Sequence, residues 1–258
     1  MRFASLGSGS RGNATVITAG STTIVVDCGF SVRDTVARLA RIGVDPGDID
    51  AVVVTHEHDD HVGGVGALAR RYGLEVWTTA GTRRAAATTL GEVPQACIFS
   101  SHDRFTIGDL LIEPIAVPHD ASEPSQFVFS DGGCRIGLLT DVGRITPHIC
   151  RMLSGLDALL LEFNHDEEML RLGPYPASLK QRIAGDLGHL SNAQSAALLR
   201  EIDTGRLQHL IALHLSQQNN DIGLVRAAAA SALNCTEDWI GVADQDSGCG
   251  WREVTPGL

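Results

Sequence analysis

Residues 56–61 have the sequence His-Glu-His-Asp-Asp-His, which gathers histidines and acids where they could bind metal ions. Histidine is the commonest metal ligand in proteins, and a carboxylate adds charge neutralisation. Alternate residues of an extended segment share a face, so His56 and His58 would point together. Asp60 and His61 would turn toward a second point as a helix begins. A polar loop with chance histidines is the alternative, but the whole chain has only ten histidines. The pattern therefore predicts two adjacent metal ions.

Three further candidate ligands each follow an apolar run that is typical of a strand. His119 follows Ile-Ala-Val-Pro, Asp141 follows Ile-Gly-Leu-Leu-Thr, and His214 follows Leu-Ile-Ala-Leu. Any one of them alone is more often a turn residue than a ligand. All three close a strand, as His56 does, and together with residues 56–61 they complete a set of five histidines and two aspartates.

The elements that must position these residues alternate between strands and helices. Apolar, β-branched runs predict strands, and apolar residues at helical spacing predict helices. Ser31 suits the N-cap of one helix, and Ser191 with Gln194 forms a capping box at the start of another. The predicted strands cover Thr22–Asp27, Ala51–Thr55, Leu110–Val117, Gln126–Ser130, Arg135–Thr140, Ala158–Glu162, Leu207–His214 and Trp239–Val242. The predicted helices cover Ser31–Ile42, Val62–Tyr72, Thr146–Leu153, Asn192–Ile202 and Asp221–Leu233.

This order of elements predicts an α/β fold. Two strand-rich halves with outer helices indicate two packed mixed sheets flanked by helices, an αβ/βα four-layer sandwich. The histidine cluster would lie at the C-terminal end of a strand, where open α/β sheets tend to bind ligands. Neither a repeat nor a Pro/Gly-rich linker divides the sequence, so we expect residues 1–258 to form a single domain.

The composition is that of a globular protein, with 43% apolar and 20% charged residues. The sequence has no apolar run of about 18 residues that would indicate a membrane span, and residues 1–10 lack the apolar core of a secretory signal. The six cysteines include no Cys-x-x-Cys pair, which favours buried free thiols in a reducing compartment. We therefore expect a cytoplasmic protein.

The net charge of −11 argues against a protein that coats nucleic acid by charge alone. It leaves open an enzyme that grips one phosphodiester, because two divalent cations would invert the local field. Carboxylate and imidazole ligands suit zinc, and manganese is the other candidate.

The His-x-His-x-Asp-His motif, followed in order by the three strand-end residues, resembles the metallo-β-lactamase superfamily. This resemblance spans almost the whole chain and implies an αβ/βα sandwich with the metal site at one edge. By resemblance, the first metal would be held by His56, His58 and His119, and the second by Asp60, His61 and His214. Asp141 would bridge both metals.

Other segments are similar to the phosphodiesterase side of that superfamily. The Leu-Glu-Phe-Asn-His-Asp, Gly-His-Leu-Ser-Asn and Leu-His-Leu-Ser blocks, from residues 161, 188 and 213, resemble the tRNase Z group. The Ser-Gly-Ser-Arg-Gly-Asn, Pro-His-Asp-Ala and Tyr-Pro-x-Ser-Leu-Lys-x-Arg segments, from residues 8, 118 and 175, resemble the WalJ/YycJ-type proteins. This second resemblance implies 5′-to-3′ exonuclease action on DNA. The substrate contacts that it implies are Arg11, Asn13, Asn164, His165, Lys180, Arg182, Ser216 and Asn219.

For a phosphodiester, a metal-bridging hydroxide would attack phosphorus and the leaving oxygen would need a proton. We expect Asp60, Glu162 and His189 to be the catalytic side chains, with His189 donating that proton. Glu162 would hold the other ring nitrogen of His189 and favour its protonated form. A helix-start residue before the capping box is the alternative role for His189.

Two other functions compete with a DNA exonuclease. A hydrolase of a small cyclic phosphodiester, lactone or thioester would use nearly the same ligands. A metal-bound scaffold without catalysis would have no need of the complete ligand set. A cleft wide enough for a strand would favour DNA, and a closed pocket would favour a small substrate.

Overall fold

The computed structural model, which describes residues 1–256, contains two β-sheets of seven strands each. The strand order is β14-β1-β2-β3-β4-β5-β6 in the first sheet and β13-β12-β11-β10-β9-β8-β7 in the second. Each sheet has three antiparallel pairs on one side and three parallel pairs on the other. The predicted pair of mixed sheets is confirmed.

Helices follow the parallel strands, as crossover connections require. The first sheet contains β1 (Arg2–Gly7), β2 (Ala14–Ala19), β3 (Thr22–Val26), β4 (Ala51–Val53), β5 (Glu75–Thr79), β6 (Gln95–Phe99) and β14 (Cys249–Glu253). The second contains β7 (Phe105–Ile107), β8 (Leu110–Ala116), β9 (Ser125–Ser130), β10 (Arg135–Leu139), β11 (Ala158–Glu162), β12 (His209–Leu213) and β13 (Gly241–Val242). The α-helices are α1 (Val32–Arg41), α2 (Asp59–Val62), α3 (Val65–Tyr72), α4 (Ala80–Ala85), α5 (Ala87–Leu90), α6 (Pro147–Leu153), α7 (Glu167–Leu172), α8 (Ala177–Ile183), α9 (Asn192–Glu201) and α10 (Ile222–Leu233). Two short 3-10 helices span Pro46–Asp48 and Glu237–Trp239.

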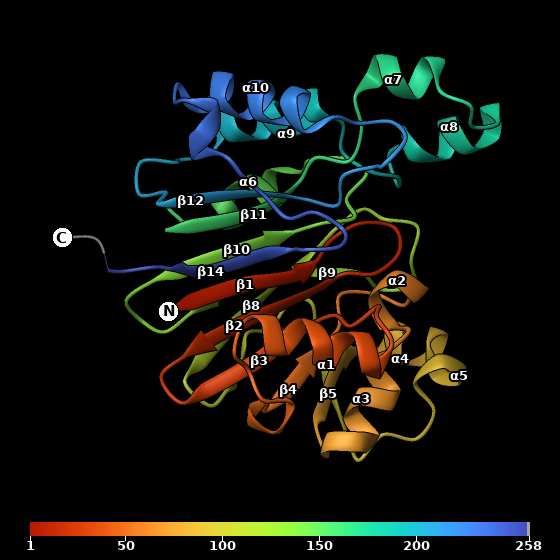
Figure 1. Cartoon of the computed structure of the whole chain (residues 1–258), viewed down its shortest axis with the longest axis vertical. Coiled ribbons are helices and arrows are strands. Elements are labelled where there is room, and N and C mark those ends of the chain that lie inside the picture. The colour runs from red at the N-terminus through yellow and green to blue at the C-terminus, as the bar shows by residue number, and fades with distance from the viewer. Residues whose placement is uncertain (257–258) are drawn as a thin grey trace.

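Three apolar layers hold these elements together. Phe3, Phe127 and Phe129 are fully buried between the two sheets. A second layer joins α1 and α3 to the outer face of the first sheet, and a third joins α6, α9 and α10 to the second. Figure 1 shows these helices on opposite sides of the paired sheets, with α7 and α8 extending past one end. Truncating one of the central phenylalanines would cost about 3–5 kcal/mol of stability.

The predicted helix Val62–Tyr72 is wrong in detail, because the chain breaks between α2 and α3 at Gly63 and Gly64. A Cβ atom on Gly64 would lie 1.9 Å from the carbonyl oxygen of Phe30. Only glycine permits this close backbone approach. The break lets residues 56–62 curl as a separate turn, which the helical spacing of the apolar residues did not reveal.

The predicted strand Trp239–Val242 is also shorter than expected, since Trp239 ends a 3-10 helix and β13 has only two residues. The N-terminal hairpin β1-β2 and the strands β5, β6, β7 and β14 were not predicted, nor were α4, α5, α7 and α8. The cap at Ser31 and the capping box of Ser191 with Gln194 are both confirmed. No helix within residues 1–256 has the length and apolarity that crossing a membrane requires.

Candidate metal centre

The candidate ligands lie where strands from both sheets end. His56 follows β4, His119 follows β8, Asp141 follows β10 and His214 follows β12. Asp27, directly after β3, has a φ of 59°, while Asp141 and His214 have φ values of 55° and 54°. This left-handed conformation costs a non-glycine residue about 1–2 kcal/mol and turns its side chain out of the strand's alternation. Backbone strain is therefore concentrated at the ends of three strands that meet at this edge.

The first ligand group consists of three histidines that face one another. The Nε2 atom of His56 lies 3.0 Å from Nδ1 of His58, and Nε2 of His119 lies 3.4 Å from the same atom. The other ring nitrogen of His56 lies 3.0 Å from the hydroxyl of Thr55, and Nδ1 of His119 lies 3.1 Å from the carbonyl oxygen of Gly188. These outer contacts orient the rings so that the inner nitrogens converge on one point.

The second ligand group combines an aspartate with two histidines. One carboxylate oxygen of Asp60 lies 3.4 Å from Nε2 of His61 and 3.4 Å from Nε2 of His214. Asp141 lies between the two groups, with one oxygen 3.2 Å from Nε2 of His61 and the other 4.0 Å from Nε2 of His119. The structure therefore brings together all seven ligands that the sequence predicted.

The chemistry of this donor set fits divalent cations. Burial and the positive charge of His61 hold the pKa of His56 well below its usual range, so His56 presents a neutral lone pair. Nε2 of His56 and Nδ1 of His58 face each other at 3.0 Å, a spacing that a hydrogen bond between them or a cation shared by both would satisfy. The buried carboxylate of Asp141 supplies the negative charge that a cation would neutralise. Histidine nitrogens with carboxylate oxygens are ligands for zinc and for manganese.

Asp27 orients one of the ligands, although the sequence analysis did not single it out. Its Oδ2 atom lies 2.8 Å from Nδ1 of His61, and its two oxygens accept hydrogen bonds of 2.8 Å from the amide and hydroxyl of Thr55. A carboxylate on the far nitrogen of a ligating histidine fixes the tautomer and the ring angle. Asp27 closes the apolar strand β3, which is the same signal that led to His119.

The loop between β1 and β2 supports a second ligand. Nδ2 of Asn13 donates a hydrogen bond of 3.1 Å to the carboxylate of Asp60. Gln245, which is distant in sequence, holds this loop by accepting from the Arg11 amide and donating to the Gly12 carbonyl, both at 2.8 Å. Nδ2 of Asn13 also lies 3.1 Å from Nε2 of His61, so Asn13 contacts two candidate metal ligands directly.

Glu162 and His189 form a pair next to the ligand groups. Nδ1 of His189 donates to Oε1 of Glu162 at 2.8 Å, while the other carboxylate oxygen accepts from the amides of Val142 and Leu190 at 3.1 Å each. Burial favours the uncharged forms of both groups, but their opposite charges prevail. The pKa of Glu162 is held at about 2, and the pKa of His189 is raised above its usual value. The pair therefore favours the protonated form of His189, in which Nε2 carries a proton.

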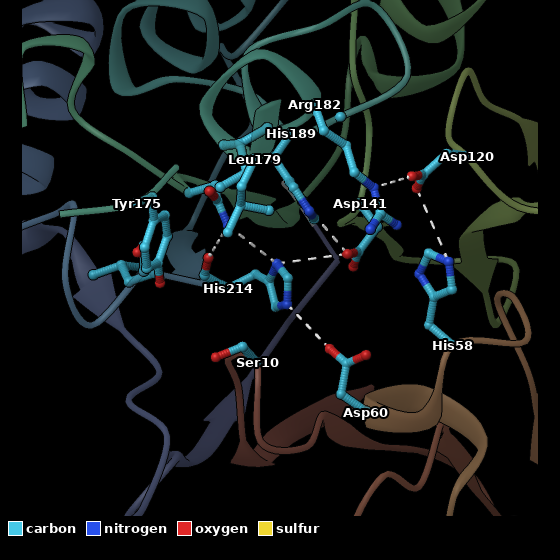
Figure 2. Close-up of a pocket in the computed structure, with 15 residues that line it drawn as sticks. Ser10, His58, Asp60, Asp120, Asp141, Tyr175, Leu179, Arg182, His189 and His214 are labelled. Atoms are coloured by element: carbon cyan, nitrogen blue, oxygen red, sulfur yellow. Dashed lines mark hydrogen bonds and ion pairs between the residues drawn. The ribbon is translucent and has the colours of Figure 1, made fainter. Parts of the chain in front are cut away.

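A pocket of about 260 Å³ opens over these groups. Figure 2 shows His214 and Asp141 in its centre, His58 and Asp120 on one side, and Tyr175 on the opposite side. The pocket is lined by Ser10, His58, Asp60, Asp120, Asp141, Asn164, Tyr175, Leu179, Arg182, Ile183, Gly188, His189, His214, Leu215 and Ser216. His189 and members of both ligand groups thus open into one cavity.

Comparison with known proteins identifies the family. The model described as a beta-lactamase superfamily domain matches residues 22–214, which include every candidate ligand. The chain belongs to the metallo-β-lactamase superfamily. It is 36% identical to "Exodeoxyribonuclease YycJ" of Bacillus anthracis, over 90% of this chain and 89% of that protein. It is also 36% identical to "Exodeoxyribonuclease WalJ" of Streptococcus pneumoniae, over 93% of this chain and 91% of that protein.

Solved structures confirm the fold. The metallo-β-lactamase fold protein YhfI from Bacillus subtilis superposes with a TM-score of 0.75 at 16% sequence identity, covering 97% of this chain and 98% of that one. The predicted fold and family are therefore confirmed, and the protein is a metal-dependent hydrolase of this fold.

Some of the predicted substrate contacts line the pocket of this metallo-β-lactamase-fold hydrolase. Asn164 donates a hydrogen bond of 3.0 Å to the carbonyl of His214, and both it and Ser216 face the cavity. Arg182 on α8 reaches over the pocket, where its Nε donates to Asp120 at 2.6 Å. Asp120 was not predicted as a site residue, although its carboxylate lies 3.9 Å from Nε2 of His58.

The remaining predicted contacts lie outside the pocket lining. Arg11 is exposed and pairs with Asp246 at 3.0 Å. Lys180 is half-buried and donates to a main-chain carbonyl of α7. His165 and Asn219 are buried behind the pocket, each with one side-chain polar atom lacking a partner among the described residues. None of these four side chains lines the pocket.

Proposed function

We propose that this hydrolase is a dinuclear phosphodiesterase that degrades DNA from a 5′ end. The observation that carries the proposal is the Glu162–His189 pair, which presents an acid to the same pocket as both ligand groups. The similarity to two bacterial proteins named exodeoxyribonucleases, over most of their length, supports DNA as the substrate. Because bacterial DNA lies in the cytoplasm, we place the enzyme there.

The proposal needs two divalent ions, either zinc or manganese. On this proposal His56, His58 and His119 hold one ion, Asp60, His61 and His214 hold the other, and Asp141 contacts both. Two such ions would activate a water molecule and offset the charge that develops on the phosphoryl oxygens.

The side chains of this chain would supply the proton transfers. Nε2 of His189 would donate a proton to the leaving oxygen while Nδ1 remains hydrogen-bonded to Glu162. Asp60 lines the pocket, and its second carboxylate oxygen would accept a hydrogen bond from the attacking water. Arg182 would contact the phosphate backbone. A lactone has less need of a separate acid, because its leaving oxygen remains tethered to the product.

The size of the pocket supports a second candidate, the hydrolysis of a small phosphodiester or ester. A volume of about 260 Å³ is near the lower end for ligand pockets and accommodates a small molecule or one nucleotide unit. The two candidates differ in what is attached to the cleaved group. A DNA strand would extend out of the cavity, whereas a small substrate would be contained in it.

A cleavage assay with defined DNA tests the proposal. The metal content of the purified protein is measured first, and end-labelled single- and double-stranded oligonucleotides are then incubated with Mn²⁺ or Zn²⁺. Stepwise loss from the 5′ end is expected, and His58→Ala should abolish it. His102→Ala, which changes an exposed histidine outside the site, should have no effect.

The variant His189→Ala separates metal binding from proton donation. It should keep the metal content and lower kcat about 100-fold or more for an ordinary phosphodiester. Two bound metals with no DNA cleavage under either ion would reject the DNA proposal and favour the small substrate. Unchanged kcat in His189→Ala would reject the assigned proton donor.

A further inference from the structure

One wall of the pocket carries apolar side chains that bind no metal and move no proton. Tyr175 precedes α8, and Leu179 and Ile183 lie on the helix itself. We call these three residues the α8 wall. Figure 2 shows Tyr175 across the pocket from His58. A hydrolase that recognised only a phosphate and two metal ions would have no use for an apolar surface at this place.

Tyr175 is held in a way that suits a stacking surface. It lies between Pro174 and Pro176, which restrict the backbone on both sides, and Pro176 caps α8. The ring is half-buried and its hydroxyl forms no hydrogen bond with another residue in the described part of the chain. A pre-positioned aromatic face loses little freedom when a planar group stacks on it.

The α8 wall and the ligand groups line the same cavity, whose volume is about that of one nucleotide. A volume of about 260 Å³ suits one nucleotide rather than two. Arg182 is on the same helix as the wall, and only its Nε atom is bonded to Asp120, so its terminal nitrogens are available to an anion. A phosphate over the ligand groups would therefore carry its sugar and base toward Tyr175.

We propose that the α8 wall is the binding subsite for the nucleobase of the terminal nucleotide. This inference rests on the proposed DNA exonuclease function and narrows its substrate to a single-stranded or frayed end. At a blunt duplex end the terminal base must first leave its partner and its stack, which opposes binding. Stacking on an aromatic side chain accepts any of the four bases. The enzyme would thus select strand ends without selecting sequence.

An oligonucleotide whose 5′-terminal nucleotide lacks its base tests the subsite. The value of kcat/KM is compared for ordinary and abasic single strands and for a blunt duplex, using the enzyme loaded with Mn²⁺. The abasic end should be cleaved about 5- to 100-fold more slowly, the range expected from losing one stacked base. The blunt duplex should also be cleaved more slowly than the ordinary single strand.

Variants at Tyr175 assign the effect to the ring. Tyr175→Leu should lower kcat/KM for the ordinary strand but not for the abasic strand, so the difference between the two substrates disappears. Tyr175→Phe keeps the ring and should retain the discrimination. Tyr72→Leu, which changes the chain's other tyrosine at the end of α3, is the matched control. It should cleave the abasic strand more slowly than the ordinary strand, as the unaltered enzyme does.

Each outcome bears on a different claim. Equal rates on ordinary and abasic ends with the unaltered enzyme would overturn the nucleobase subsite while leaving the exonuclease proposal intact. The same would follow if Tyr175→Leu slowed both substrates equally. An unaltered enzyme that binds metal but cleaves none of the oligonucleotides would overturn the proposed function, and this inference with it.

Discussion

Replacing Asp27 by asparagine would test how the protein prepares one metal ligand. Asparagine has nearly the same shape and tolerates the left-handed conformation at this position, where φ is 59°. It therefore adds little backbone strain. The change removes the negative charge that faces Nδ1 of His61 at 2.8 Å.

The cost follows from the hydrogen bonds that Asp27 accepts. Its carboxylate receives the Thr55 amide and hydroxyl as well as the His61 ring, each at 2.8 Å. An asparagine must point its NH2 group either toward the Thr55 donors or toward His61. The second choice moves the ring proton to Nε2, the atom that would bind the metal. Loss of such a support weakens metal affinity about 10- to 100-fold, or about 1.4–2.7 kcal/mol.

A chelator-competition titration measures this loss for each bound ion. The affinity of the site that contains His61 should fall, while the group of His56, His58 and His119 should keep its metal. Asp50→Asn is the matched control, because Asp50 is exposed and accepts a hydrogen bond of 2.8 Å from the Thr23 amide without contacting a histidine. The reasoning would be refuted if Asp27→Asn kept the metal affinity of the unaltered protein and only lowered the melting temperature of the metal-free protein. Asp27 would then be a purely structural residue.

Further predictions concern proton release on metal binding, the loop that carries Asn13, and the cysteine thiols. Burial lowers the pKa of His214, but nearby carboxylates raise it to about 10, and they also raise that of His61, so both are protonated at pH 7 without metal. Loading the metal site at pH 7 should therefore release about two protons, and binding should strengthen as pH rises. Calorimetry in two buffers of different ionisation enthalpy that shows no release would contradict this. Asn13→Ala should weaken metal binding about 10-fold, and an effect on KM for DNA alone would instead support a substrate contact. Burial raises the pKa of the Cys28 thiol to about 11, so iodoacetamide should label exposed Cys235 well before Cys28, as mass spectrometry can check.

Local sequence was sufficient to predict much of the fold and the ligand set. Buried strands such as β11 and β12 are continuous apolar runs, and capped helices such as α1 and α9 carry their own start signals. Each candidate metal ligand is a histidine or aspartate that ends such a strand or lies in the cluster at 56–61. These signals are contained within a few residues, so they can be recognised without knowledge of the fold.

The missed elements were those whose pattern depends on their neighbours. β6 is an exposed edge strand with little apolar alternation, and α7 and α8 are short helices with few buried side chains. The break at Gly63 and Gly64 was missed for a related reason. It exists because the Phe30 carbonyl from a distant segment comes within contact distance, which no local pattern encodes.

The sequence by itself determined which residues could bind metal and, through apolar periodicity, that two sheets would carry them. Only the tertiary structure decided how those residues are supported and what they face. Asp27 reaches His61 across 34 positions of sequence, and Gln245 holds a loop 234 positions away from it. Tyr175 faces the ligands only because α8 folds back over the strand ends. The physical reason is that ligand type depends on side-chain chemistry, whereas orientation and shape of the pocket depend on contacts between segments far apart in the chain.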